Sequence, residues 1–386
     1  MIQRKICVVT TTRAEYGLLK PLLSQIENDQ ALQLQLLVSG THLSPEYGET
    51  YREIEKDFHI TQKIPMQLQA DDALSTSRAM AQLQIDVTKT LQDLQSDIVI
   101  VLGDRYEIMA VAIATMMLHT PLAHIHGGET TEGAMDEAIR HSITKMAHLH
   151  FPATKEYAQR VIQLGEDPKR VFQVGALGVE NIQTLKLLDK NTFEKSIGVK
   201  LQKRNILVTY HPETLSSQTP KEEFCELLSA LKELDETLII FTKANADSHG
   251  RVINSMIDEY VSTNSNSVVF SSLGQLRYLS ALQFVDAVVG NSSSGIIEVP
   301  SFHKATINIG ERQKGRTQAQ SIINTPCKKE AIREAIQMSY SEKFQKVLKG
   351  SQNPYKSENT SFQIKEVLKN SVLTNILKKS FYTFEC

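Results

Sequence analysis

The chain has 386 residues but no tryptophan and only four cysteines. The cysteines form no Cys-x-x-Cys pair and no disulfide-like spacing, which excludes a disulfide framework and is typical of a reducing compartment. They lie at Cys7, Cys225, Cys327 and Cys386. The apolar stretch Ile6–Val9 is too short for a signal-peptide core, and the longest one, Ile108–Leu118, falls short of the ~20 residues that span a bilayer. We therefore expect a soluble cytoplasmic protein without a membrane partner.

An excess of either charge is also absent. Lysine and arginine total 42 against 44 aspartate and glutamate, a formal net charge of −2. Such a balance provides no global field for a polyanion, so we expect no nucleic-acid partner. The composition is that of an ordinary globular protein, and the length predicts two or three domains.

Several nucleotide and metal signatures are missing. The sequence contains no Gly-x-Gly, which excludes the dinucleotide fingerprint and argues against nicotinamide chemistry. The loop 310–317 is close to a Walker A motif but has Arg316 in place of lysine, so we interpret it as a basic loop facing an anion, with a P-loop as the alternative. His124 and His126 lie one residue apart, but no His-Glu-x-x-His motif or cysteine pair accompanies them. We expect no metal and no cofactor; one histidine of the pair should pack and the other face the ligand.

Short β-branched runs alternate with longer segments of helical periodicity, which predicts an α/β protein with parallel sheets. The expected helices include Tyr16–Glu27, Thr76–Leu94, Tyr106–Leu118 and Asp136–Met146. The expected strands are Lys5–Thr10, Gln33–Ser39, Asp97–Leu102, Leu122–Ile125, Leu149–Pro152, Val171–Val174, Ile206–Thr209, Thr237–Thr242, Ser267–Phe270, Asp286–Val289 and Ala305–Ile309. We place one domain at 1–178, a second at 179–362, and a C-terminal helix and tail at 363–386 that pack back toward the first domain.

Polar residues cluster after the predicted strands, where parallel sheets bind ligands. Gly290–Gly295 precedes a helix start, so its backbone N–H groups and serine hydroxyls suit a phosphate, and a helix cap is the alternative. Glu298 could bind a ribose diol or simply face the helix dipole. Asp104 and Asp136 are acid–base candidates, although Asp136 could instead cap the helix Glu137–Met146.

Further candidates follow the strands in the same way. Arg13, Arg105 and Arg312 suit anion contacts, with surface ion pairs as the alternative. His141, five residues after Asp136, is expected to orient a neighbour. Two such ligand-binding edges facing each other would make an interdomain cleft.

Seven ordered segments together resemble those of the bacterial hydrolysing UDP-N-acetylglucosamine 2-epimerases of sialic acid biosynthesis. They are Thr11–Gly17, Val38–His42, Gly103–Glu107, His124–Glu129, Asp136–Lys145, His211–Thr214 and Gly290–Gly295. The resemblance implies two Rossmann-like domains facing a cleft, the glycosyltransferase-B-like architecture, with UDP held mainly by the second domain. It also implies conversion of UDP-N-acetylglucosamine and water to N-acetylmannosamine and UDP.

The resemblance further implies residue roles. Asp104 and Asp136 match the catalytic carboxylates of the family; related branches have glutamate where this sequence has His126, so a three-carboxylate mechanism does not transfer. The predicted catalytic group is Asp104, Asp136, His126, Arg105 and Glu129, with Glu129 ranked below His126. The predicted substrate-binding group is Arg13, His42, His141, His211, Asn245, Asn291, Ser292, Ser293, Ser294, Gly295, Glu298 and Arg312.

Three alternatives stay open at this point. The substrate could be UDP-2,4-diacetamido-2,4,6-trideoxyglucose of a legionaminic acid pathway. The enzyme could be non-hydrolysing and return UDP-N-acetylmannosamine. Outside enzymes, the chain could be a nucleotide-sugar sensor. We expect a UDP-sugar as ligand and a homodimer or homotetramer as the assembly.

Overall fold

The computed structural model describes residues 3–66, 72–132, 134–213, 219–244 and 250–384. The chain divides into two compact units. Unit 1 comprises 1–129, 136–181 and 357–386, and unit 2 comprises 130–135 and 182–356. The division after residue 181 lies three residues beyond the predicted domain boundary at 178, and the chain returns to unit 1 at residue 357 rather than 363.

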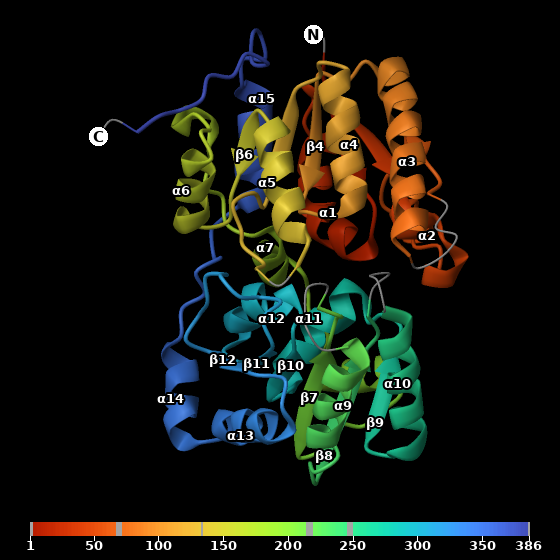
Figure 1. Ribbon diagram of the computed structural model, residues 1–386, viewed down its shortest axis with the longest axis vertical. Coiled ribbons are helices and arrows are strands. Elements are labelled where there is room, and N and C mark those ends of the chain that lie inside the picture. The colour runs from red at the N-terminus through yellow and green to blue at the C-terminus, as the bar shows by residue number, and fades with distance from the viewer. Residues whose placement is uncertain (1–2, 67–71, 133, 214–218, 245–249, 385–386) are drawn as a thin grey trace. The chain divides into compact units, whose positions relative to one another are not determined.

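Unit 1 is built on a six-stranded parallel sheet in the order β3-β2-β1-β4-β5-β6. Strands β4 and β6 of this sheet are labelled in Figure 1. Its strands are β1 (Arg4–Thr10), β2 (Leu32–Val38), β3 (Gln62–Lys63), β4 (Ile98–Leu102), β5 (Leu122–Ile125) and β6 (Leu149–Phe151). Its helices are α1 (Arg13–Glu27), α2 (Tyr51–Ile54), α3 (Ala73–Leu94), α4 (Tyr106–Met117), α5 (Asp136–Met146), α6 (Lys155–Gln163) and α15 (Thr360–Asn370), and α7 (Leu177–Thr184) crosses into unit 2. Short 3-10 turns cover Gly40–Leu43, Pro45–Tyr47 and Pro168–Arg170.

Two apolar layers sandwich the sheet of unit 1. Residues of α1 and α15 pack on one face, and residues of α3, α4 and α5 pack on the other. Strand β4 is buried along its whole length, as expected for a central strand of a parallel sheet covered on both faces. Because both faces of the sheet are covered, its polar side chains lie at the carboxyl ends of the strands. Parallel sheets bind their ligands at this edge.

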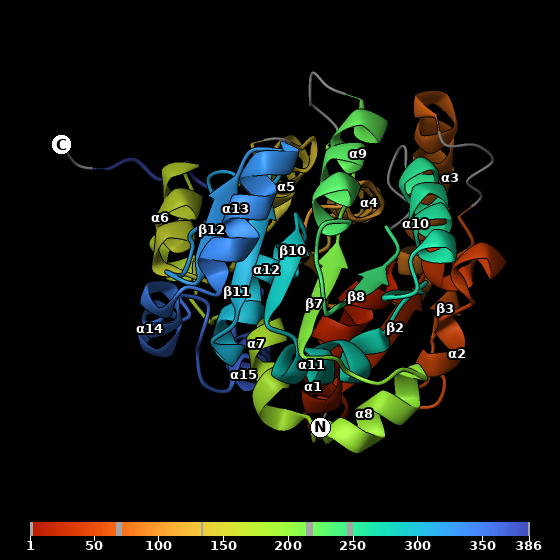
Figure 2. The ribbon, with the colours of Figure 1, turned by 90° about the horizontal axis from the view of Figure 1, so that it is seen from below.

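Unit 2 repeats this plan with a six-stranded parallel sheet in the order β12-β11-β10-β7-β8-β9 (Figure 2). Its strands are β7 (Arg204–Thr209), β8 (Thr237–Thr242), β9 (Ser267–Phe270), β10 (Ala287–Gly290), β11 (Ala305–Ile309) and β12 (Ile322–Thr325). Its helices are α8 (Lys190–Ile197), α9 (Pro220–Leu231), α10 (Gly250–Thr263), α11 (Gly274–Phe284), α12 (Ser293–Ile297), α13 (Lys329–Ser339) and α14 (Glu342–Gly350), with a 3-10 turn at Val299–Phe302. Helices α9, α10 and α13 cover one face of the sheet, and α8 and α11 cover the other.

Local sequence explains where the first helix begins. The Thr12 side chain accepts a hydrogen bond from the Glu15 backbone N–H, and the Glu15 carboxylate bonds back, a capping box that starts α1. Helix α5 has the bounds that the sequence predicted, because Ile139, Ile143 and Met146 recur at helical spacing on its apolar face.

One predicted strand is wrong and two short strands were not predicted. The segment Val171–Val174 forms only a single bridge, between Val171 and His150, because it meets the edge of the sheet beside the three-residue strand β6. The unpredicted strands, β3 and β12, are edge strands that pair on one side only. Among the residues described, no helix combines the length and apolar character that crossing a membrane would require.

Candidate active site

The carboxyl edge of the unit 1 sheet gathers the acid–base candidates. Asp104 follows β4 after Gly103, which has a positive φ of 81° that glycine adopts without strain. His126 follows β5, and Asp136 is the first residue of α5, half-buried. The structure thus brings three separate sequence segments to the same end of one sheet, as parallel topology requires.

Arg140 links these segments and was not among the predicted site residues. Its side chain is fully buried. The guanidinium donates from Nε to Asp104 Oδ2 at 2.9 Å and from Nη1 to the Glu129 carbonyl at 2.9 Å and Glu137 Oε2 at 2.8 Å, and Nη2 also contacts Asp104. A charge-assisted fork of this kind fixes the orientation of its carboxylate partner. The sequence signal was present, since Arg140 lies four residues after Asp136, one helical turn further along α5.

His126 forms a second feature of this edge. Its backbone has a φ of 66°, in the left-handed region that non-glycine residues seldom adopt and that clusters at functional sites. Its Nδ1 lies 3.2 Å from Glu129 Oε1, within ion-pair distance if the ring is protonated. Its Nε2 is buried and has no hydrogen-bond partner within the residues that the structure describes. An imidazole nitrogen that is buried and has no hydrogen-bond partner among the described residues is available to exchange a proton with a ligand.

His124 is the packed member of the histidine pair. Its ring is fully buried, with Nε2 2.8 Å from the Gly103 carbonyl and Nδ1 3.1 Å from Thr144 Oγ1 on α5. It therefore braces the residue before Asp104 against α5. Burial lowers the pKa of His124 to about 3, although the hydrogen bond to Gly103 opposes this.

The low pKa of His124 predicts acid sensitivity. In the unfolded chain His124 binds a proton as pH falls below its ordinary pKa of 6.5, whereas in the folded chain it stays neutral down to about pH 3. The free energy of unfolding therefore decreases as pH falls from 6.5 toward 3. We expect His124→Gln to reduce the slope of unfolding free energy against pH by up to ~1.4 kcal/mol per pH unit between pH 6 and pH 5. Urea titrations at several pH values measure this. The exposed His59→Gln is the matched control, and an equal slope in the two variants would contradict the prediction.

The other predicted residues of unit 1 already have partners inside the unit. Arg13 pairs with Glu53 at 2.8 Å, and Arg105 donates from Nε to Glu107 at 3.1 Å. His42 is fully buried between Thr10 and Thr50, and its burial lowers its pKa to about 4. His141 Nε2 lies 3.0 Å from Glu137 Oε1.

Glu15 is a buried carboxyl that the sequence reasoning missed. It accepts hydrogen bonds from the backbone N–H and the hydroxyl of Thr11. Burial raises its pKa to about 7, against the opposing influence of Arg105. The signal that could have found it is its place in the predicted segment Thr11–Gly17.

In unit 2, Asn291 organises the loop after β10. Its side chain accepts the His211 backbone N–H at 2.7 Å and donates to the His211 carbonyl at 2.8 Å. Its own carbonyl receives Arg312 Nη1 at 3.2 Å and Gln313 Nε2 at 2.8 Å. Asn291 therefore connects three predicted ligand-binding segments at the carboxyl edge of the sheet.

The serines beyond Asn291 form the start of α12. Ser292 is the N-cap residue, and the Ser294 hydroxyl accepts a hydrogen bond from Tyr278 at 2.7 Å. Gly295 packs on Thr306, where an added Cβ would come within 2.8 Å of a methyl carbon. Glu298 follows α12 and is almost completely buried. A helix cap and a bound phosphate use the same backbone N–H groups. The observed Ser292 cap is therefore compatible with both predictions for this segment, a phosphate site and a simple helix cap.

Glu213 holds the basic loop in place and was also missed. Its Oε1 accepts the backbone N–H groups of Glu311 at 2.9 Å and Arg312 at 3.1 Å. Gly310, with a φ of 76°, leaves the space that this carboxylate occupies. Burial raises the pKa of Glu213. The predicted residue Asn245 lies outside the described residues, and the described part of the chain holds no group of three or more His, Cys, Asp or Glu side chains suited to a metal ion.

These units define a class of protein: two Rossmann-like α/β units of the glycosyltransferase-B-like type. The S. aureus MnaA–UDP structure has the same fold, with a TM-score of 0.80 over 99% of this chain and 100% of that one at 17% sequence identity. The family model described as UDP-N-acetylglucosamine 2-epimerase matches residues 24–369. The chain belongs to this family.

Two curated relatives are similar over most of their length. A GDP/UDP-N,N'-diacetylbacillosamine 2-epimerase (hydrolyzing) from Campylobacter jejuni is 47% identical over 84% of this chain and 85% of the relative. The polysialic acid biosynthesis protein P7 of Escherichia coli is 41% identical over 99% of this chain and 98% of the relative.

Proposed function

We propose that the protein is a hydrolysing 2-epimerase that converts UDP-N-acetylglucosamine and water to N-acetylmannosamine and UDP. The observation that carries the proposal is the network of unit 1, in which the buried Arg140 bonds both Asp104 and the Glu129 carbonyl, and the Glu129 carboxylate lies 3.2 Å from His126. A protein that only bound a UDP-sugar would not need a buried acid–base group of this kind. The name of the Escherichia coli relative, a polysialic acid biosynthesis protein, supports a place in sialic acid synthesis.

The chemistry explains what the residues have to do. The proton on C2 of the sugar is not adjacent to a carbonyl, so a base cannot remove it until departure of UDP gives C1 positive character. Groups that stabilise the leaving diphosphate therefore act first. In unit 2 we assign this role to the Ser292–Ser294 backbone, His211 and Arg312, which the Asn291 and Glu213 hydrogen bonds hold in place.

Proton transfer falls to unit 1. Asp104, held in place by the guanidinium of Arg140, is suited to act as the base that removes the C2 proton and leaves a 2-acetamidoglucal. His126, whose buried Nε2 has no hydrogen-bond partner among the described residues, is suited to deliver a proton to C2 from the opposite face while water adds at C1. We assign Asp136, at the start of α5, to the same step.

The name of one relative favours a second candidate substrate, a UDP-linked diacetamido sugar. The Campylobacter jejuni relative at 47% identity is named for a diacetylbacillosamine nucleotide, which carries a second acetamido group and no 6-hydroxyl. The same leaving group and the same C2 chemistry would apply, so the catalytic assignments do not distinguish the two sugars. The second candidate is therefore hydrolytic 2-epimerisation of UDP-2,4-diacetamido-2,4,6-trideoxyglucose.

Turnover of the two UDP-sugars in heavy water tests the proposal. We expect release of UDP and a free 2-epimerised sugar that carries deuterium at C2, because the glycal is reprotonated from solvent. Nuclear magnetic resonance of the product and chromatography of the nucleotide measure both events. A product that keeps hydrogen at C2 would contradict the elimination step. UDP-linked product would indicate the non-hydrolysing reaction, and binding without turnover would indicate a sensor.

A further inference from the structure

The C-terminal strap, which we define as residues 371–384, is anchored to unit 1. Arg170 donates from Nη1 to the Ile376 carbonyl at 2.7 Å and from Nη2 to the Lys378 carbonyl at 3.3 Å. The Tyr382 backbone N–H donates to the Gly165 carbonyl at 2.9 Å. The Phe381 ring packs against Gly165, where any larger residue would collide with it. The strap is therefore held at several points, although most of its side chains are exposed.

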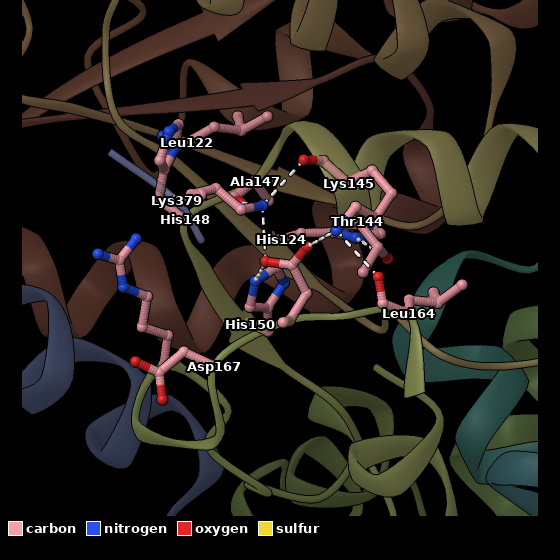
Figure 3. A network of polar contacts seen from close by, with 12 residues as sticks. Leu122, His124, Thr144, Lys145, Ala147, His148, His150, Leu164, Asp167 and Lys379 are labelled. Atoms are coloured by element: carbon pink, nitrogen blue, oxygen red, sulfur yellow. Dashed lines mark hydrogen bonds and ion pairs between the residues drawn. The ribbon is translucent and has the colours of Figure 1, made fainter. Parts of the chain in front are cut away.

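Lys379 is the strap residue that reaches the end of α5 (Figure 3). Its Nζ donates to the Ala147 carbonyl at 2.6 Å and to the Lys145 carbonyl at 2.9 Å. Helix α5 ends at Met146, with no glycine after it to close the last turn. The carbonyl end of a helix carries partial negative charge and free acceptors, and a cation there satisfies both. Lys379 thus acts as a C-terminal cap supplied from more than 230 positions along the chain.

A buried carboxylate holds the Lys379 ammonium in position. Glu166 is fully enclosed and lies 2.6 Å from Lys379 Nζ, 2.5 Å from Lys145 Nζ and 3.0 Å from His150 Nε2. Burial raises the pKa of Glu166, but the hydrogen bonds from His150, Lys145 and Lys379 outweigh this and bring it to about 2. Because Lys145 and His150 remain when Lys379 is removed, the carboxylate keeps partners, and the effect of such a change falls mainly on α5.

The other end of α5 carries the candidate catalytic groups. Asp136 and Arg140 lie in its first two turns, and an 11-residue helix is only ~16 Å long. Thr144, near the capped end, contacts His124, whose other ring nitrogen lies 2.8 Å from the carbonyl before Asp104. A displacement of α5 along its axis would therefore reach Asp104 by two routes, through Arg140 and through His124.

We infer that Lys379 is a positioning residue for the acid–base site: its ammonium caps α5 and so sets the place of Arg140 and Asp136 relative to Asp104. The expected effect of Lys379 on turnover rests on the proposed function. The expected effect of Lys379 on the stability of α5 does not depend on that function.

The test compares Lys379→Met with Lys378→Met, an exposed neighbour for which no side-chain contact is seen in the described part of the chain. In Lys379→Met we expect amide hydrogen exchange over residues 136–148 to be roughly fivefold faster. We also expect kcat for UDP release to fall roughly tenfold with KM changed less than about twofold, because misplaced catalytic groups slow the reaction without weakening the UDP contacts. Lys379→Arg, which keeps the cation, should recover most of kcat.

The outcomes separate the inference from the proposed function. If the wild-type protein releases no UDP from either UDP-sugar, the proposed function fails, and faster exchange in Lys379→Met would still support the cap. Equal exchange and equal kcat in the two methionine variants would overturn the inference. A parallel loss of kcat, UDP affinity and folding in both Lys379→Met and the milder Lys379→Gln would also overturn it, because it would show a structural role only.

Discussion

Asn in place of Asp104 is expected to lower kcat by about 10³-fold while the affinity for UDP stays within about twofold. The amide is nearly isosteric and can still accept one hydrogen bond from Arg140, so the network in unit 1 should persist. It cannot take up the C2 proton. The groups we assign to the diphosphate lie in unit 2, whereas Asp104 lies in unit 1. Asp104→Asn removes the base but leaves the proposed nucleotide site intact. The variant should therefore lose kcat while its affinity for UDP is kept.

Initial rates of UDP release and calorimetric titration with UDP measure the two quantities for Asp104→Asn. Asp93→Asn, an exposed aspartate at the end of α3, is the matched control and should match wild type in both. Wild-type kcat in Asp104→Asn would remove Asp104 from the catalytic group. Loss of the folded state would instead return it to a structural role.

Methionine in place of Arg140 is expected to destabilise unit 1 by about 3 kcal/mol and to reduce kcat to near background. Methionine fills much of the same volume, but it leaves Asp104 and Glu137 without their shared cation and the Glu129 carbonyl without its donor. The two carboxylates are partly exposed, which keeps the cost at the lower end of the range for a broken buried ion pair. Both effects have the same cause, because one guanidinium supports the fold and orients the base.

Urea unfolding and UDP release measure the effects of the Arg140 substitution. Arg78→Met, on the exposed side of α3, is the control and should change the unfolding free energy by less than about 0.5 kcal/mol. Arg140→Lys should give an unfolding free energy and a kcat between those of wild type and Arg140→Met. Lysine keeps the charge but cannot bridge Asp104, Glu137 and a carbonyl as a planar fork does. Wild-type turnover in Arg140→Met would contradict the role we propose for the network.

Much of the fold could be predicted because it depends on local patterns. The bounds of α5 follow from apolar residues at helical spacing, and those of β5 from a short apolar run between a proline and a glycine pair. The edge strands β3 and β12 escaped prediction because they are short, pair on one side and lack a continuous apolar run. The segment Val171–Val174 has the apolar pattern of a strand but meets too short a neighbour to extend its pairing.

The candidate site could also be predicted only where it depends on local sequence patterns. Asp104, His126 and Asp136 could be proposed from the sequence because they follow strands or start a helix, at the edge where parallel sheets bind ligands. Arg140, Glu15 and Glu213 were missed because a charged residue in an amphipathic helix or loop usually faces solvent. The partners of Arg140 and Glu213 lie far away in the sequence, at Asp104 and at the backbone of Glu311 and Arg312. Glu15 has local partners at Thr11, but its burial depends on the packing of the whole unit.

The sequence by itself determined the α/β class, the two-unit organisation and the segments that carry the chemistry, because periodicity and strand-end motifs are local properties of the chain. Only the tertiary structure decided which of those side chains meet. It placed Arg140 between Asp104 and Glu129, turned one histidine of the pair inward and brought Lys379 to the end of α5. The physical reason is that hydrogen bonds and ion pairs between distant residues depend on distances of a few ångströms, which packing of the whole unit sets.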